Sequence, residues 1–373
     1  MPSLSPSNSP PRCWAEIDLP ALRHNLEACH RYAGENCGIM AVVKADAYGH
    51  GLSHIVGALG DVDWFGVANL QEAERVREAA KQREVNVLIL SPALPEEIEA
   101  IVVGKFSASV STPDEVAAYA AAANRLGKTA RLHAVADTGM GRMGGLPDVF
   151  PALARTVIDS PNCRLEGIET HFPVADEDAA FTREQIERFS ALLAQIDLPD
   201  DCRIHLGNSA GLLGFSELTG FAKLARPGLA LYGVSPLPDT GEELRPILSW
   251  KSRITLVRGI PAGISISYGR TFVSERPMRI ATLGVGYGDG YPRHLSGTGA
   301  EVIIAGQRCP LLGRVTMDQI VVDISHLPEE IVEGEAVILL GDAITATELA
   351  ERAGTIPWEI FTGITSRVER VYH

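Results

Sequence analysis

The sequence predicts an α/β fold with two domains, an N-terminal (β/α)8 barrel and a C-terminal domain that is mostly β. Eight short apolar runs alternate with helical patterns between residues 39 and 233. Beyond about Asp239, runs of Val, Ile, Leu and Thr are instead separated by Gly and Pro turns. With 373 residues, 46% of them hydrophobic, the chain is long enough to give each domain a core.

The first twelve residues differ from the rest of the chain. The segment MPSLSPSNSPPR has too few apolar side chains to offset the entropy of ordering, so we expect a disordered tail at 1–12. We expect the barrel domain at 13–240 and the β-rich domain at 241–373. The joint between them, PLPDTGEELR at 236–245, is polar and rich in turn residues, as linkers are.

The apolar runs that we assign to barrel strands are short and bounded by polar or turn residues. They are 39–44, 64–70, 87–91, 106–111, 130–136, 165–172, 203–209 and 228–233. Helical patterns lie between them, for example at 70–83 and 113–126. The second of these has Thr112 as its N-cap, Pro113 at its first position and Glu115 at the capping-box position. A doubly wound open sheet is the alternative fold.

The C-terminal part has the texture of a β domain. Its apolar runs are bounded by Gly and Pro turns, and helical periodicity returns only near Thr347. The runs are 254–257, 279–284, 301–304, 320–324 and 336–340.

Composition excludes several classes of function. Lys and Arg total 33 and Asp and Glu total 47, and the resulting formal net charge of −14 disfavours binding to nucleic acid or to anionic membranes. No run approaches the roughly 20 apolar residues of a membrane span, and no signal peptide is recognisable, so we expect a cytoplasmic protein. The six cysteines form no C-x-x-C pair, and we expect no metal site.

Polar residues follow several of the predicted strands at the end where barrel enzymes carry their active sites. They are Lys44, the segment 137–142, His171, the pair Asn208 and Ser209, and Arg226. Lys44 follows three residues that should be buried, so its amine should be partly desolvated, with a lowered pKa, and able to condense with an aldehyde. A lysine that reaches solvent at a strand end is the alternative interpretation.

The same end of the barrel offers groups for an anion. Backbone N–H groups at Gly228 and Leu229, together with the Ser209 hydroxyl, could hold a phosphate. Combined with Lys44, they point to a phosphorylated aldehyde cofactor, pyridoxal 5′-phosphate.

Nine segments, in order along nearly the whole chain, carry a resemblance to a known family. They are WAEIDLPALRHNL (14–26), AVVKADAYGHG (41–51), DTGMGRMG (137–144), THF (170–172), GNSAGLL (207–213), RPGLALYG (226–233), SYGRTF (267–272), GVGYGDGYPR (284–293) and GRVTMDQ (313–319). With these segments the chain resembles the alanine racemase family. The resemblance implies a homodimer with shared active sites that acts on a small amino acid.

The resemblance also implies residue roles. Lys44 would hold the cofactor covalently and act as one proton-transferring base, and Tyr268 of the partner subunit would be the other. Two bases on opposite faces of the α-carbon suit a racemisation. Arg226 would contact the pyridine nitrogen, with His171 in support. The other implied cofactor residues are Tyr48, Asn208, Ser209, Gly228 and Leu229, and the implied substrate residues are Arg142, Met317, Asp318 and Tyr287. Core packing is the competing interpretation for Met317.

Two positions depart from the family pattern. Many members have a carbamylated lysine where this chain has Val135, and we expect chloride or another anion near Arg142 in its place. Members often have a tyrosine where this chain has Ser366, which puts strict alanine specificity in doubt.

The implied activity is the interconversion of L-alanine and D-alanine, which would supply D-alanine for peptidoglycan. Three alternatives for a protein that binds the cofactor stay open, beside a structural barrel whose polar strand-end residues are accidental and which would bind no chromophore. One is a racemase of broader or different specificity, for example for serine. A second is a pyridoxal-phosphate decarboxylase, which Arg226 argues against because those enzymes should place an acidic group on the pyridine nitrogen. A third is a protein that binds the cofactor without catalysis.

Overall fold

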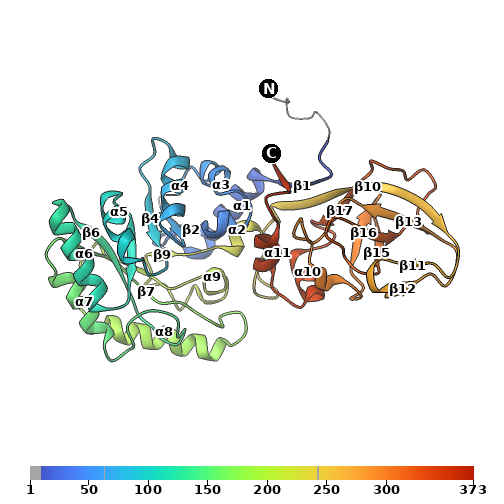
Figure 1. Cartoon of the computed structure of the whole chain (residues 1–373). Helices are drawn as coiled ribbons and strands as arrows, with labels where there is room; N and C mark the ends of the chain where they lie inside the picture. Colours follow the sequence, from blue (N-terminus) through green and yellow to red (C-terminus); the bar gives the residue numbers. More distant parts are fainter. Residues whose placement is uncertain (1–9, 63, 242) are drawn as a thin grey trace, which may run out of the picture. The chain divides into compact units, whose positions relative to one another are not determined.

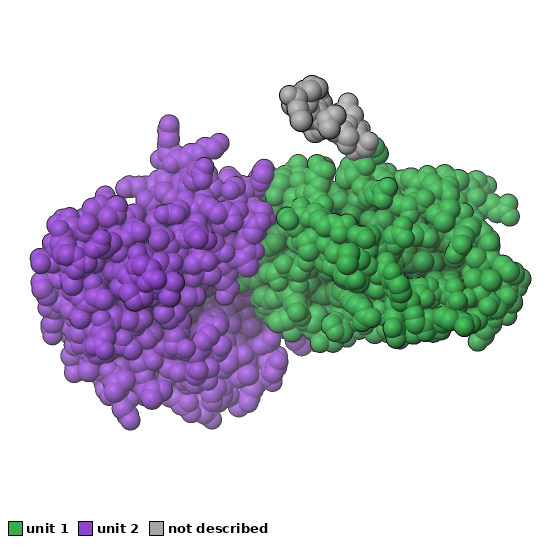
Figure 2. Space-filling model, in the orientation of Figure 1, with its two compact units in different colours: residues 1–19, 48–50, 246–373 green, residues 20–47, 51–245 purple. Residues whose placement is uncertain are grey.

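The structure is a computed structural model that describes residues 10–62, 64–241 and 243–373, so residues 1–9 of the expected tail lie outside the described part. The chain forms two compact units (Figures 1 and 2). Unit 1 contains residues 1–19, 48–50 and 246–373, and unit 2 contains residues 20–47 and 51–245.

Unit 2 is a closed parallel barrel. Hydrogen bonds join each strand to the next from β2 to β9, and β9 pairs with β2 to close the circle. Closure confirms the predicted barrel and excludes the doubly wound open sheet. The strands are β2 (Gly38–Val42), β3 (Trp64–Val67), β4 (Asn86–Ile89), β5 (Ser107–Val110), β6 (Ala130–Val135), β7 (Cys163–Glu169), β8 (Arg203–His205) and β9 (Leu224–Ala225).

One strand prediction is wrong. Residues 228–233 were expected to form the last barrel strand, but Leu229–Tyr232 is a 3-10 helix, η2, and the strand is the two-residue β9. The run begins at Gly228, whose backbone is not extended, and the Leu231 N–H closes a turn on its carbonyl. The run is apolar because it is buried. The Tyr232 hydroxyl donates to the carbonyl of Val42, the last residue of β2.

Helices follow the strands around the barrel (Figure 1). They are α1 (Leu19–Ala33), α3 (Leu52–Ala58), α4 (Leu70–Ala80), α5 (Ile98–Val103), α6 (Pro113–Leu126), α7 (Phe150–Asp159), α8 (Ala179–Leu193) and α9 (Ser209–Phe215). The predicted start of α6 is confirmed. The Thr112 hydroxyl accepts from the Glu115 N–H, and the Glu115 carboxylate accepts from the Thr112 N–H.

The two halves of the barrel interior differ in chemistry. Beside β2, β3, β4 and β9 the interior is apolar, with a cluster made of Met40, Trp64, Leu88 and Leu224. On β5 to β8 it is polar and buried, with the side chains of Ser107, Ser109, His133, Glu166, Glu169 and His205. Barrel interiors are ordinarily filled by branched apolar side chains, so the polar half needs a reason.

Unit 1 is built on a mostly antiparallel sheet in the order β13-β16-β15-β14-β17-β10-β1-β18. Its strands are β1 (Cys13–Ile17), β10 (Leu248–Ile260), β13 (Met278–Leu283), β14 (Glu301–Ile304), β15 (Gln307–Leu312), β16 (Ile320–Asp323), β17 (Ala336–Leu340) and β18 (Glu369–Tyr372). A small ribbon, β11 (Ser265–Ile266) with β12 (Phe272–Val273), and the helices α10 (Ala346–Ala353) and α11 (Pro357–Gly363) accompany it. Residues 13–19, expected at the start of the barrel domain, lie in unit 1 because β1 pairs with β10 and β18.

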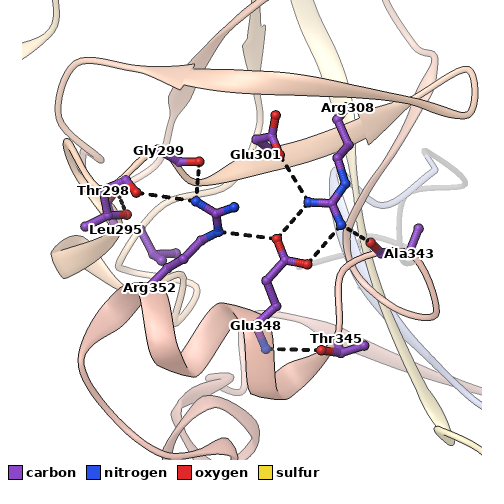
Figure 3. A network of polar contacts seen from close by, with 9 residues as sticks. All are labelled: Leu295, Thr298, Gly299, Glu301, Arg308, Ala343, Thr345, Glu348 and Arg352. Atoms are coloured by element: carbon purple, nitrogen blue, oxygen red, sulfur yellow. Dashed lines mark hydrogen bonds and ion pairs between the residues drawn. The ribbon is translucent and has the colours of Figure 1, made fainter.

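A surface network of charges ties α10 to the sheet (Figure 3). Glu348 on α10 accepts from Arg308 of β15 at 2.7 and 2.9 Å, and from Arg352 one turn later on the helix at 3.2 Å. Arg308 also reaches Glu301 on β14 at 3.1 Å, and Arg352 donates to the Gly299 carbonyl at 2.6 Å. Figure 3 shows Glu348 at the centre of these contacts.

Candidate active site

Lys44 follows β2 and enters a turn of unusual conformation. Ala45, Asp46 and Ala47 all have φ between 51° and 55°, the left-handed region that costs a non-glycine residue about 1–2 kcal/mol each. Two side chains of α4 hold the start of this turn: Glu72 accepts from the Ala45 N–H at 2.7 Å, and Arg75 donates to the Asp46 carboxylate at 2.5 Å. The lysine is therefore placed by a strained but well-anchored segment, as is common at functional sites.

The Lys44 amine lies in a positively charged, largely buried environment. Burial lowers its pKa, and the nearby guanidinium groups of Arg142 and Arg226 lower it further, while Glu72 opposes the shift. In the described part of the chain the amine makes no hydrogen bond or ion pair. The result is a partly desolvated lysine that more readily provides a neutral amine, the form that condenses with an aldehyde and accepts a proton.

Arg226 is buried just after β9 and is held from several sides. Its guanidinium donates to the Thr170 carbonyl at 2.7 Å and to His205 Nδ1 at 2.6 Å, with His171 Nδ1 at 3.3 Å. The Glu169 carboxylate lies 3.5 Å away. Burial lowers the pKa of the guanidinium from its ordinary value and Glu169 raises it, but an arginine stays charged in proteins.

His171 follows β7 and faces the same cations. Burial lowers its pKa to about 3, with further lowering by Arg226, Arg142 and Lys44. The ring is therefore neutral near pH 7, and since Arg226 can only donate, His171 Nδ1 is the acceptor.

The barrel residues that we expect to bind the phosphate lie at the starts of two short helices, α9 and η2. Asn208 caps α9, its side chain accepting from the Gly211 N–H at 2.9 Å. The Ser209 hydroxyl accepts from the N–H groups of Gly228 at 3.0 Å and Ala230 at 3.1 Å, so these two donors are already used. The first N–H groups of a helix have no partner within it, which leaves those of Ser209 and Leu229 directed outward from α9 and η2.

Arg142 lies in a loop that another residue organises. Asp137 accepts from the N–H groups of Gly139, Met140 and Gly141 at 2.9 to 3.1 Å, and so fixes the loop that carries Arg142. The Arg142 side chain is exposed and has no ion pair within the described residues. Val135 is 5% exposed at the end of β6. The exposure of Arg142 weakens the expectation that its charge is costly without an anion.

Tyr268 lies in unit 1 on an irregular segment. It is 72% exposed and follows Ser267, which has φ 63° and donates to the Arg314 carbonyl at 2.6 Å. At Gly269, φ is 73°, and a Cβ would lie 2.8 Å from the Arg314 guanidinium. The backbone on both sides of the tyrosine is thus packed on Arg314 while the phenol projects into solvent.

The other substrate candidates of unit 1 lie side by side. Tyr287 and Gly288 donate their N–H groups to the carbonyls of Thr316 and Met317, at 3.0 and 2.8 Å. Met317 is 53% exposed and Tyr287 is 41% exposed. An exposed pair of large apolar side chains is atypical of core packing, so the competing interpretation of Met317 does not hold for the isolated chain.

Asp318 has a partner that sequence reasoning missed. Arg367 donates to Asp318 at 2.9 Å and lies 3.3 Å from Asp289. A charge pair between residues 49 positions apart leaves no local signal.

The structure thus collects the predicted site residues in two groups, one in each unit. Lys44, Arg142, His171 and Arg226 interact within unit 2, and Ser209 binds the backbone at Gly228 there. Tyr268, Tyr287, Met317 and Asp318 belong to unit 1, and so does Tyr48, which ends the left-handed turn with φ 54°.

The barrel group fits a phosphorylated aldehyde. It offers a partly buried amine of lowered pKa, the outward N–H groups of two helix starts beside a serine hydroxyl, and the buried guanidinium of Arg226. Within residues 10–62, 64–241 and 243–373 no group of three His, Cys, Asp or Glu side chains could hold a metal ion. In the same part of the chain, no helix combines the length and hydropathy needed to cross a bilayer.

Comparison with known proteins gives consistent matches over nearly the whole chain. Residues 17–236 match the family described as "Alanine racemase, N-terminal domain", and residues 247–372 match "Alanine racemase, C-terminal domain". The alanine racemase of Methylacidiphilum infernorum is 41% identical, covering 97% of this chain and 93% of its own. That of Halothermothrix orenii is 38% identical, covering 96% of both.

Solved structures agree with these matches. Alanine racemase from Streptomyces lavendulae superposes with a TM-score of 0.89 at 35% identity, covering 98% of both chains. Alanine racemase from Bartonella henselae, described with covalently bound pyridoxal phosphate, superposes with a TM-score of 0.90 at 27% identity, covering 98% of this chain and 100% of its own.

Proposed function

The chain belongs to the alanine racemase family, and from that premise we propose that it is a pyridoxal-phosphate-dependent isomerase that interconverts L-alanine and D-alanine. The observation that carries the proposal is the Lys44 amine just after β2, partly buried, of lowered pKa and near Arg226. A barrel-only cofactor carrier would not need the exposed tyrosine of unit 1.

Lys44 has two tasks in this proposal. It holds the cofactor through its amine, and its Nζ moves a proton at the substrate α-carbon on one face. The bound cofactor supplies an electron-withdrawing ring that stabilises negative charge at that carbon. The lowered pKa of Lys44 favours the neutral amine, which can accept a proton near neutral pH.

Tyr268 of the partner subunit is the second base, acting at its hydroxyl on the opposite face. A phenol that is 72% exposed in the single chain is suited to work in another copy of the protein. We therefore propose a homodimer with shared active sites. In it, one subunit supplies Tyr268, Met317, Asp318 and Tyr287 to the substrate pocket of the other.

Arg226 distinguishes a racemase from a decarboxylase. It would face the pyridine nitrogen, and because it stays charged and only donates, it leaves that nitrogen unprotonated. A weaker electron sink limits side reactions at the α-carbon. His171, neutral and bonded to Arg226, keeps the guanidinium in place.

The remaining candidates hold the ends of the cofactor and substrate. Tyr48, Ser209 and Leu229 would bind the phosphate through a hydroxyl and backbone N–H groups, with Gly228 and Asn208 shaping the turns that present them. Arg142 would attract the substrate carboxylate, and its exposed position leaves its guanidinium available for that task.

The proposal is tested by a visible absorbance spectrum of the purified protein, followed by L-alanine addition and a chiral product assay. An absorbance band of lysine-bound cofactor together with formation of D-alanine supports it. Lys44→Ala should abolish both. Tyr268→Phe should keep the band and lose at least about 100-fold in rate, the usual contribution of a general base. Racemisation at nearly the wild-type rate by Tyr268→Phe would refute the second base.

A racemase of broader or different specificity is the second candidate, and Ser366 favours it. Serine is much smaller than the tyrosine usual at this position, so a larger substrate could be accommodated. Rates with L-serine beside L-alanine decide this, and Ser366→Tyr should narrow the range if the side chain sets it.

This chain has Val135 where many family members have a carbamylated lysine, so Arg142 lacks the anion expected to orient it. We propose that chloride or another small anion orients this guanidinium. Activity in chloride-free acetate buffer should then fall and recover when chloride is returned. Equal rates in both buffers refute the anion.

In the cell, the proposed role is cytoplasmic supply of D-alanine for peptidoglycan, since that polymer requires the D-isomer.

A further inference from the structure

A continuous polar chain runs through the barrel interior and ends on Arg226. His205 Nδ1 lies 2.6 Å from the Arg226 guanidinium, and His205 Nε2 lies 2.7 Å from His133 Nδ1. His133 Nε2 then faces the Glu166 carboxylate at 3.5 Å. All four side chains are at most 4% exposed. We call Glu166, His133 and His205 the relay.

The position of every proton in the relay follows from Arg226. An arginine only donates, so His205 Nδ1 must accept, and a neutral His205 then carries its proton on Nε2. That proton is donated to His133 Nδ1, which leaves the His133 proton on Nε2, directed at Glu166. Protonating either ring a second time would set two donors against each other, so both imidazoles are neutral.

The two ends of the polar chain carry opposite charges. Burial drives the pKa of His205 well below its ordinary value, and Arg226 lowers it further. At the other end, burial raises the pKa of Glu166, but the contact with His133 and the hydrogen bonds from Arg131 and Ser107 outweigh it and bring the value to about 2. An anion at one end and a cation at the other align the dipoles of both rings.

A local irregularity of β7 makes the relay possible. The pairing of β6 with β7 shifts by one residue, since Leu132 pairs with Leu165 but His133 pairs with Gly167. The extra residue is Glu166, and it changes the alternation so that Glu166 and Glu169, three positions apart, both face the interior. Gly167 leaves room for the His133 ring, because a Cβ there would lie 2.3 Å from His133 Nδ1.

We propose that Glu166 and His133 are positioning residues for Arg226, acting through His205 to fix the face that the guanidinium turns toward the cofactor's ring nitrogen. The inference rests on the proposed function and deepens it. Thr170 and His171 hold the guanidinium on one side, and the relay holds it on the other. Apolar side chains would fill this half of the barrel at lower cost in desolvation, so the polar chain is retained for orientation.

The first test uses the protein itself and needs no activity. The imidazole nitrogens of the full-length protein are isotopically labelled, with and without pyridoxal phosphate, and assigned with His133→Gln and His205→Gln. Nuclear magnetic resonance should find the ring proton of both histidines on Nε2, and His205 should stay neutral across about pH 5 to 8, where an ordinary histidine titrates. A proton on Nδ1 of either ring, or a second proton on either, overturns the relay.

The second test separates orientation from packing. His133→Phe keeps the ring volume and removes both contacts, so kcat should fall about tenfold, with KM for alanine nearly unchanged because the relay does not touch substrate. The visible absorbance band of the cofactor should be lost faster per turnover, because an Arg226 that is held less firmly allows the ring nitrogen to be protonated more often. Met40→Leu, in the apolar half of the barrel, is the packing control and should change none of these.

The outcomes are distinguishable from failure of the proposed function. If the wild type forms no band and no D-alanine, the racemase proposal fails, whereas the protonation of the two rings still tests the relay. A folded His133→Phe protein with wild-type kcat and wild-type band loss overturns the positioning role. If that variant does not fold, Glu166→Gln takes its place: it removes the charge, keeps an acceptor and should reduce kcat less.

Discussion

The network around Glu348 in unit 1 and the relay in unit 2 are each centred on polar and charged side chains, but their surroundings are opposite. In the first, the Arg308 and Glu348 side chains are 41% and 26% exposed (Figure 3). In the second, His133 and Glu166 are 0% and 4% exposed. Exposed ion pairs contribute roughly 0.2–1 kcal/mol each, whereas removing one partner of a buried pair costs about 3–5 kcal/mol.

The difference teaches how to read a charge cluster. Water can replace any member of the surface network, so its geometry specifies little beyond the docking of α10. Nothing replaces a member of the relay, so each hydrogen bond there dictates the next. We therefore expect the relay to control orientation at Arg226 and the surface network to add a small, salt-dependent stability.

Removing Glu166 should give the largest effect. Glu166→Ala removes the buried carboxylate that accepts from Ser107 and Arg131 and that His133 Nε2 faces, and we expect a loss of about 3–5 kcal/mol in the stability of the barrel. Hydrogen exchange of peptides from β6 and β7 in denaturant measures it. Glu166→Gln, which keeps the shape, should lose less, and a loss below about 1 kcal/mol for Glu166→Ala would remove the contrast between the two networks.

Acid should lower the stability of unit 2 at a higher pH than it weakens the surface network of unit 1. The unfolded imidazoles of His171 and His205 take up protons below about pH 6.5, but the native ones do not, since the pKa of His171 is about 3 and that of His205 is well below its ordinary value. The unfolded state binds more protons, so stability falls as pH falls, by up to about 1.4 kcal/mol per unit for each ring.

The surface network should respond in a lower window. Arg308 lowers the pKa of Glu348 below its ordinary value of 4.5, so its contribution is kept above that value and lost only as pH falls further. Between about pH 6.5 and 4.5, hydrogen exchange corrected for intrinsic rates should therefore report weakening in β6 and β7 peptides and little in those of α10. Equal weakening of both would contradict the assignment.

The close approach of His133 to β7 provides a smaller and more local test. In Gly167→Ala the new Cβ would meet His133 Nδ1 at 2.3 Å and the Arg203 carbonyl at 2.9 Å, so the ring must shift. We expect about 1–3 kcal/mol of destabilisation, typical of overpacking, with a fall in kcat. Gly127→Ala, at a helix end with open space, is the matched glycine control and should affect stability but not kcat.

The sequence predicted much of the fold and little of the relay, for reasons that particular residues illustrate. Helix α6 was predictable because its start is a local signal, from Thr112 to Glu115. Strand β9 was misplaced because two residues carry no periodicity, and the apolar run after it is a buried 3-10 helix. Lys44 and Arg226 stood out as polar groups at strand ends, and their placement near each other follows from the barrel.

The relay could not be predicted because its determinants are not local. Glu166 and Glu169 face one side only through the register shift in β7, and regular alternation assigns them to opposite faces. His133 and His205 are 72 positions apart and meet only when the barrel closes. The Asp318 to Arg367 pair was missed for the same reason.

The smallest expected effect comes from the surface network. Glu348→Ala removes the acceptor shared by Arg308 and Arg352, yet both guanidinium groups keep other partners, at the Ala343 and Gly299 carbonyls, and have access to water. We expect a loss of about 0.5–1 kcal/mol in α10, seen by hydrogen exchange and reduced further at about 1 M salt, where exposed charges are screened. Glu351→Ala, on the same helix and without an ion pair among the described residues, corrects for the change in helix propensity. A loss above about 3 kcal/mol that salt does not reduce would place this network with the buried one, and exposure would then not be what separates them.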